Sequence, residues 1–161
     1  LDSNLTMFGN SDIHAPVDYF YDKSDGEHRP ITLVFAKEKT EYGIREALDN
    51  GRTAVYYKNM IYGDEWFLKE LFYASLNVAE IHVLHEDYSS TWVKAITNIS
   101  SIPLQMEMIV GEDEEPRMIT LLPEEGITVA FPADDLLRKW KLTNFHVKPG
   151  ESLTIEYISS Y

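Results

Sequence analysis

The sequence predicts a two-part protein, an α/β segment over residues 1–76 followed by an antiparallel β-sandwich over residues 77–161. In the first part, two segments rich in β-branched and aromatic residues flank an amphipathic helix pattern, which is typical of α/β units. After Asn77 the chain changes to short alternating runs separated by turn residues, as in an immunoglobulin-type sandwich. The 161 residues are 44% apolar, which is enough to form packed cores.

The composition excludes several classes of function. The chain carries 27 Asp and Glu against 14 Lys and Arg, a formal net charge of −13, which disfavours non-specific binding to nucleic acid and to anionic membranes. It has no cysteine, which excludes disulfides, zinc-thiolate sites and thiol chemistry. No apolar run is long enough for a transmembrane helix. The chain starts without Met or a signal peptide, so we interpret it as an internal start, and its location stays open, a bacterial periplasm included.

The run NLTMFG, residues 4–9, predicts a short buried strand that ends just before Asp12 and His14. On a strand, residues i and i+2 point to the same side, so this carboxylate and imidazole would converge in a way that suits a metal ion. The alternative is a capping aspartate beside a structural histidine. Two ligands do not make up a metal site.

Residues 31–57 predict a strand, a helix and a second strand. ITLVFA and TAVYY favour strands because they are β-branched and aromatic. Between them, Thr40 suits an N-cap and Gly51 a C-terminal stop. The helix would present one apolar face made by Ile44, Ala47 and Leu48. We expect two parallel strands with the helix as their crossover.

A second helix is predicted for residues 63–76, with Asp64 as its N-cap. The apolar residues of this helix are unusually aromatic, so we expect the helix to pack between the two parts. These apolar residues are Trp66, Phe67, Leu71, Phe72 and Leu76. Six or seven strands should follow, and the segments that read as strands are AEIHVLHE, TWVKAITNIS, IPLQMEMIVG, PRMITLLPEEG, ITVAFPADD and ESLTIEYISSY. The segment LRKWKL is too charged and too short to be assigned.

The loop over residues 15–30 is long, and long ordered loops often carry function. At its end, His28 and Arg29 are candidates to contact a substrate phosphate, because the arginine fork matches phosphate oxygens. The alternative is an acidic surface loop whose arginine pairs with a carboxylate.

Other polar motifs have ordinary interpretations. His82 and His85 would face opposite sides of a strand and so would not share a metal, and His146 would be a turn or strand residue. GEDEEP, residues 111–116, fits a solvated hairpin tip rather than a calcium loop. The sequons NLT and NIS are taken as chance. Ser11, beside Asp12 and His14 in sequence, does not form a triad with them.

The strand ending in GNSDIH, followed by a loop and RPITLVFAKEKTEYGIREALDNGRTAVYY, resembles the C-terminal end of the PHP (polymerase and histidinol phosphatase) family, and more narrowly the phosphodiesterase-like PHP proteins of Bacteroides-type bacteria. The segment with LTNFHVKPG is similar to the accessory β-domain that follows such catalytic barrels. The resemblance implies that the first part is the end of a distorted (β/α)7 barrel.

The resemblance also implies a cluster of divalent ions (zinc, manganese or iron) that activates water against a phosphoester, with Asp12 and His14 as ligands from the last barrel strand. The His-x-His strand and the further ligands of the family do not occur here. We therefore expect a substrate that is a phosphorylated small molecule or a phosphodiester for the intact protein, and an inactive fragment with no tightly bound metal. Exposed strands at the missing barrel, in residues 5–8, ITLVFA and TAVYY, would favour self-association. The alternative is a non-catalytic β-sandwich binding module with an α/β docking segment.

Overall fold

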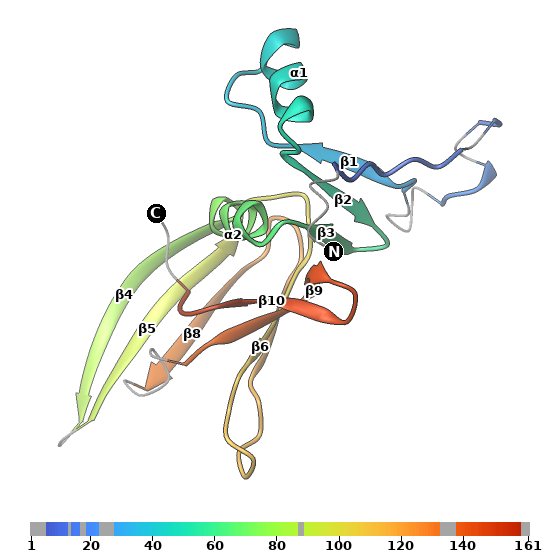
Figure 1. Ribbon diagram of the computed structural model, residues 1–161. Coiled ribbons are helices and arrows are strands. Elements are labelled where there is room, and N and C mark those ends of the chain that lie inside the picture. The colour runs from blue at the N-terminus through green and yellow to red at the C-terminus, as the bar shows by residue number, and fades with distance from the viewer. Residues whose placement is uncertain are drawn as a thin grey trace. The chain divides into compact units, whose positions relative to one another are not determined.

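The computed structural model describes residues 6–12, 14–16, 19–22, 28–86, 89–132 and 138–158, and for 81–86 and 89–90 it describes the backbone alone. The fold is rich in β-sheet and has two described helices (Figure 1). It divides into two compact units, Leu1–Leu68 with Phe145–Glu151, and Lys69–Asn144 with Ser152–Tyr161. Neither described helix has the length and apolarity needed to cross a lipid bilayer.

The first unit is built on a small antiparallel arrangement of strands. Strand β1 pairs with β2, and β2 pairs with β3, both antiparallel. β3 also pairs in parallel with the end of β9 through Ile61 opposite Phe145. The elements are β1 (Ile31–Val34), α1 (Glu41–Asp49), β2 (Thr53–Tyr57), β3 (Met60–Gly63) and the last residues of β9 (Trp140–Lys148).

Helix α1 has the ends that the sequence predicts. The Thr40 hydroxyl accepts a hydrogen bond from the Gly43 N–H at 3.0 Å, and Gly51 adopts a positive φ of 66° just beyond the helix. Of the predicted apolar face, Ala47 is buried and Ile44 is exposed.

The expected parallel crossover is wrong, because β1 and β2 run antiparallel with Ile31 opposite Tyr56 and Val34 opposite Thr53. The Phe35 N–H donates to the Arg52 carbonyl at 3.0 Å, so the chain leaves and re-enters the ladder at one end. Helix α1 is therefore an insertion in a hairpin. The lengths of the segments do not separate the two arrangements, since a nine-residue helix is long enough for either.

The boundary between the two units falls within helix α2 (Glu65–Ala74). Its residues up to Leu68 belong to the first unit, and those from Lys69 belong to the second. Asp64 accepts a hydrogen bond from the Trp66 N–H at 2.9 Å, as expected of its N-cap. Phe72 is completely buried, whereas Trp66 is 66% exposed. The burial expected of this helix from its aromatic residues is therefore present at Phe72 and absent at Trp66.

Six or seven strands are expected in the second part of the chain, and the structure has the seven strands β4 to β10 there, in two sheets (Figure 1). Strand β9 is the one that no predicted segment covers. One sheet has the order β4-β5-β8, and the other has β9 beside β6 and β10, with β7 beside β6. The strands are β4 (Leu76–Glu86), β5 (Ser89–Asn98), β6 (Leu104–Met108), β7 (Met118–Leu121), β8 (Gly126–Pro132), the start of β9, and β10 (Glu151–Ile155).

The core of the second unit lies where alternate side chains of these strands meet. The Phe131 ring on β8 contacts the Trp140 ring on β9 edge-on, with centroids 6.2 Å apart, and so joins the two sheets. The large side chains of this core that are completely or almost completely buried include Ile96, Leu104, Met106, Leu121, Trp140, Leu142, Leu153 and Ile155.

Candidate functional site

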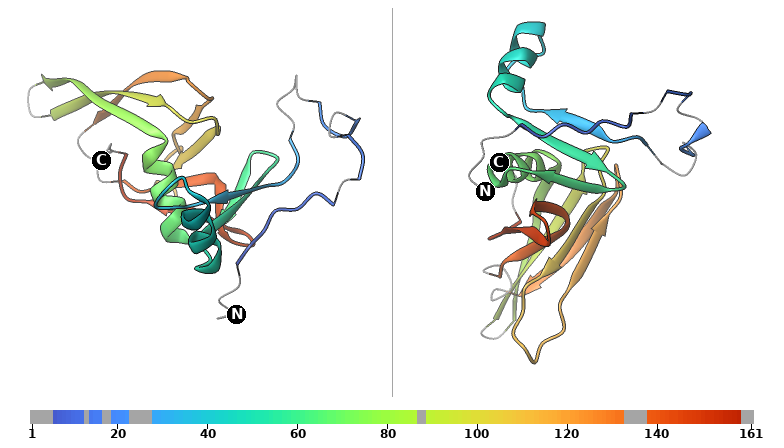
Figure 2. Two further views of the ribbon diagram at one scale, coloured as in Figure 1. Left: turned by 90° about the horizontal axis from the view of Figure 1, so that it is seen from above. Right: turned by 45° about the vertical axis from the view of Figure 1, so that its right-hand side comes forward.

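The segment before Asp12 is held against β1 and β2 without forming a regular strand. The Gly9 N–H donates to the Thr32 hydroxyl at 2.9 Å, and the Met7 carbonyl accepts from the Thr53 hydroxyl at 2.9 Å. A Cβ atom at Gly9 would lie only 3.0 Å from the Val55 side chain, so the absence of a side chain at Gly9 favours this close approach. Figures 1 and 2 show the segment running beside β1. The expected buried strand is wrong over residues 6–9, which form no strand and leave Phe8 59% exposed, and its residues 4 and 5 lie outside the described residues.

Asp12 and His14 lie close together. Asp12 has a φ of +49°, a left-handed conformation that few residues other than glycine adopt, and its N–H donates to the Asn10 side-chain oxygen at 3.2 Å. The His14 Nε2 lies 3.6 Å from the Asp12 Oδ1, and the two side chains are 91% and 90% exposed. The expected convergence is present, but neither residue lies in a strand, so the alternation of a strand does not produce it.

His28 faces the protein. Its Nδ1 donates to the carbonyl of Arg29 at 2.7 Å, and its ring packs on Tyr56 with centroids 4.3 Å apart. The Nε2 of His28 is buried, with no hydrogen-bond partner among the described residues. Burial also raises the pKa of Tyr56. The His28 ring therefore packs on the strand hairpin, while Arg29 beside it is exposed.

Arg29 lines a pocket of about 380 Å³ in the first unit. The pocket lies against the segment that leads to Asp12, and its other lining residues are Gly9, Asn10, Ser11, Pro30, Ile31 and Thr32. The structure thus brings Arg29 next to the stretch Gly9–Ser11, which is directly followed by Asp12. The sequence reasoning missed Asn10 and Ser11 as lining residues, although their position between Gly9 and Asp12 was the available signal.

The donors present suit a divalent cation in kind and not in number. A carboxylate and an imidazole are ordinary ligands for zinc and manganese, but such ions take four to six donors. Among the described residues, no group of three or more His, Cys, Asp or Glu side chains could hold a metal ion. The described part of this chain therefore does not make up a metal site by itself.

The remaining polar motifs carry no further site. His146 lies in strand β9, where its ring stacks on Tyr62 at 5.0 Å and its Nε2 donates to the Met60 sulfur at 3.4 Å. The segment 111–116 between β6 and β7 is exposed throughout, which confirms a solvated hairpin tip. The side chains of His82 and His85, and the NLT sequon at residue 4, lie outside the described residues.

The Asn98 side chain of the NIS sequon is completely buried. Its amide nitrogen donates to the carbonyls of Ile102 and Leu121 at 2.8 and 3.1 Å. Its oxygen accepts from the Ser100 N–H at 3.0 Å. This amide is used inside the protein, in agreement with the interpretation of the sequon as chance.

Comparison with known proteins places the chain beside one solved structure. No protein-family model matches the chain, and no curated protein matches it. The solved structure is that of a two-domain protein containing a predicted PHP-like metal-dependent phosphoesterase from Bacteroides vulgatus ATCC 8482, with 36% sequence identity and a TM-score of 0.81. The match covers 97% of this chain and 46% of that protein, so this chain spans about half of its length.

The likeness supports a coarse conclusion. The two proteins share 36% of their residues over nearly the whole of this chain. They are therefore similar in sequence as well as in fold. The chain is thus similar to about half of a two-domain protein that contains a predicted PHP-like metal-dependent phosphoesterase.

Proposed function

We propose that this chain is the C-terminal part of a metal-dependent phosphoesterase of PHP type, which hydrolyses a phosphomonoester or phosphodiester with water. The observation that carries the proposal is the 36% identity with the two-domain protein of Bacteroides vulgatus over 97% of this chain. The chain by itself is proposed to be inactive, because the described residues supply only Asp12 and His14 as convergent metal ligands.

In this proposal, Asp12 and His14 contribute to a divalent-cation site whose other ligands lie elsewhere in the intact protein. The chemistry that such a site supplies is activation of a water molecule and neutralisation of negative charge on the phosphoryl group. Both side chains are about nine-tenths exposed, so both are free to turn towards an ion. The side-chain oxygen of Asn10 accepts a hydrogen bond from the Asp12 N–H, and this bond fixes the backbone from which the Asp12 carboxylate extends.

Arg29 is proposed to bind the substrate phosphate. It is exposed at the edge of the 380 Å³ pocket and lies beside the segment that leads to Asp12. A guanidinium pairs with two phosphate oxygens at once, which both attracts and orients the substrate. His28 is proposed to position Arg29, because the His28 Nδ1 donates a hydrogen bond to the Arg29 carbonyl. The substrate class is a phosphorylated small molecule or a phosphodiester.

The fold is proposed to combine the end of a PHP-type barrel with an immunoglobulin-type sandwich. The strand order supports the sandwich, since the first, second and fifth strands of the second unit form one sheet and the third pairs with the sixth in the other. This is the pairing pattern of immunoglobulin-like and fibronectin-like sandwiches, in which Greek-key connections cross between sheets.

The test compares this chain with the longer protein, that is, the intact protein of which this chain is proposed to be the C-terminal part. The longer protein should hydrolyse a chromogenic phosphodiester or phosphomonoester, and a chelator should stop it. This chain alone, with added zinc or manganese, should show no turnover. In the longer protein, Asp12→Ala and His14→Ala should each remove most activity, while Asp113→Ala, at the exposed hairpin tip, should keep it. Circular dichroism establishes that each variant folds. Near-normal turnover of both Asp12→Ala and His14→Ala would contradict the assignment of these ligands.

The second candidate function is a binding module in which the sandwich binds a ligand. A pocket in the second unit favours it and leads to the inference below, which does not depend on the phosphoesterase proposal.

A further inference from the structure

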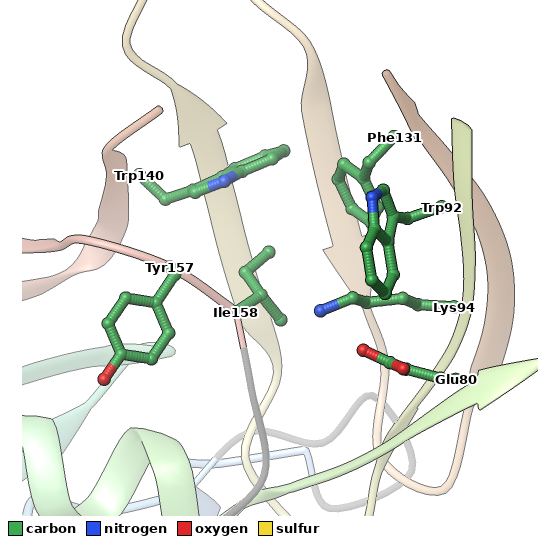
Figure 3. A pocket seen from close by; sticks show the side chains of 7 residues that line it. All are labelled: Glu80, Trp92, Lys94, Phe131, Trp140, Tyr157 and Ile158. Atoms are coloured by element: carbon green, nitrogen blue, oxygen red, sulfur yellow. The ribbon is translucent and has the colours of Figure 1, made fainter. Parts of the chain in front are cut away.

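The second unit contains a pocket of about 180 Å³ whose walls are mostly aromatic (Figure 3). We call it the aromatic pocket, and its lining residues are Glu80, Trp92, Lys94, Phe131, Trp140, Tyr157 and Ile158. Trp140, Phe131 and Ile158 are buried and form its base, whereas Glu80 and Tyr157 are exposed. The pocket is therefore a lined hollow that opens to solvent.

Strand register explains why four of these side chains share one face. Glu80 on β4 lies opposite Lys94 on β5, and Trp92 on β5 lies opposite Phe131 on β8. Trp92 and Lys94 are two residues apart on one strand, so their side chains point to the same side. The sheet β4-β5-β8 thus presents two rings and two opposite charges side by side.

Lys94 stands out because its face of the sheet belongs to the core. The same face carries Ile96 and Asn98, which are both completely buried. A lysine at such a position costs stability, since placing an ammonium in a partly buried site removes water from it. Figure 3 shows the ammonium of Lys94 and the carboxylate of Glu80 directed into the pocket. Neither head group forms a hydrogen bond or ion pair with a residue that the structure describes, so both can bind a ligand.

The chemistry of the walls limits the ligand. One positive and one negative side chain give the pocket no net charge, so neither an anion nor a cation is favoured over a neutral molecule. The two head groups offer a hydrogen-bond donor and an acceptor, which together match a hydroxyl group. The face of Trp92 attracts C–H groups that carry partial positive charge. The volume is close to the roughly 150 Å³ that accepts one benzene ring, and below the roughly 300 Å³ at which pockets for drug-sized ligands begin.

We propose that the aromatic pocket binds a single neutral, hydroxylated six-membered ring, a hexose residue, which stacks on Trp92 and bonds its hydroxyls to Lys94 and Glu80. A hexose has an apolar C–H face and a hydroxylated edge, so it matches both kinds of wall at once. Because the ligand is small and the pocket is open, we expect a dissociation constant in the millimolar range.

The first experiment titrates the full chain with methyl β-glucoside, methyl β-galactoside and methyl α-mannoside, followed by tryptophan fluorescence and saturation-transfer NMR. Two of the three tryptophans line the pocket, and Trp66→Phe removes the signal of the third. Choline and cyclohexanol serve as a cationic and an apolar comparison. At least one glycoside should saturate and should bind more tightly than both. If no glycoside saturates, or if choline or cyclohexanol binds more tightly than every glycoside, the proposal is wrong.

The second experiment uses a matched pair of charges as its control. Lys94→Met and Glu80→Gln should each weaken glycoside binding by about tenfold, because each loses a hydrogen bond to a charged group. Lys141→Met and Glu107→Gln alter another opposite pair on facing strands, joined at 3.3 Å and outside the pocket, and should leave binding unchanged. Lys94→Met should keep or raise the melting temperature, so its loss of binding does not reflect unfolding. Unchanged binding in both pocket variants would overturn the site.

Discussion

At the scale of single residues, buried polar side chains form specific hydrogen bonds that the sequence does not reveal. Asn98 looks like part of a sequon, yet its completely buried amide joins the end of β5 to the carbonyls of Ile102 and Leu121. Tyr56 looks like one aromatic residue of a strand, yet its hydroxyl donates to the Asn59 side-chain oxygen at 3.0 Å, across a two-residue turn. Such contacts depend on the tertiary fold, so residue spacing alone does not predict them.

Asn98→Ala should lower the free energy of unfolding by about 3 kcal/mol, because two or more buried carbonyls lose their donor without gaining water. Asn77→Ala is the control. Asn77 is exposed on β4, and its loss should change stability by less than about 0.5 kcal/mol. Urea denaturation of both variants measures the difference, and equal stabilities would contradict the role assigned to the buried amide.

Tyr56 should make the protein less stable in alkali. Burial raises the pKa of its hydroxyl above 10.0, so the folded state holds this proton after the unfolded state has lost it. The stabilisation is fully present below about pH 10 and is lost as the pH rises through the folded pKa. Tyr56→Phe removes the titration. Between about pH 9 and 11 the parent should therefore lose more stability than Tyr56→Phe, since the other tyrosines titrate in both. Parallel curves would refute this.

At the scale of elements, the sequence predicts what is local and fails where partners must be chosen. The cap at Thr40, the cap at Asp64 and six of the seven strands β4 to β10 follow from spacing and residue type. The direction of β2 against β1 does not, because ITLV and TAVYY would be equally good in a parallel ladder. Over residues 6–9 the predicted strand fails for a related reason, since hydrogen bonds to the side chains of Thr32 and Thr53, and not a strand ladder, hold Gly9 and Met7 in place.

The candidate site was predictable to the same degree. Two-residue spacing predicts the convergence of Asp12 and His14, but in the structure neither residue lies in a strand and Asp12 has a positive φ. The pocket between Arg29 and Asn10 depends on how a loop returns to the strands, which no local pattern encodes.

Helix α2 allows a sharp test of burial at the element scale. Phe72 is completely buried and Trp66 is 66% exposed on the same helix. Phe72→Ala should lower the free energy of unfolding by about 3–5 kcal/mol, because it leaves a cavity. Trp66→Ala should change it by less than about 1 kcal/mol, since little of the indole is removed from water. Guanidinium denaturation distinguishes them, and a larger loss for Trp66→Ala would mean that the exposed face of α2 is covered in solution.

At the scale of the whole molecule, exposed apolar side chains and a large negative charge act in opposite directions. In the first unit, Met7, Phe8 and Ile31 are exposed around β1, the edge strand of its sheet in the described part of the chain. The expectation that TAVYY is exposed as well is wrong, because Ala54 and Tyr56 in β2 are buried. Exposed apolar side chains at a strand edge favour pairing with a second copy. The formal net charge of −13 at pH 7 keeps copies apart by repulsion.

We therefore expect this chain to self-associate more strongly as the pH falls towards its pI of about 4.7, because protonation of carboxylates removes the repulsion and leaves the apolar edge unchanged. Added salt at neutral pH should act in the same direction by screening the charge. Ile31→Lys places a charge on the exposed edge strand and should shift the chain towards monomer. Ile109→Lys adds the same charge at an exposed residue of the second unit and should have less effect, which separates the edge from the net charge. Sedimentation velocity at several pH values and concentrations measures all of this. A monomer at every pH and concentration, or equal shifts for Ile31→Lys and Ile109→Lys, would show that the edge at β1 does not drive association.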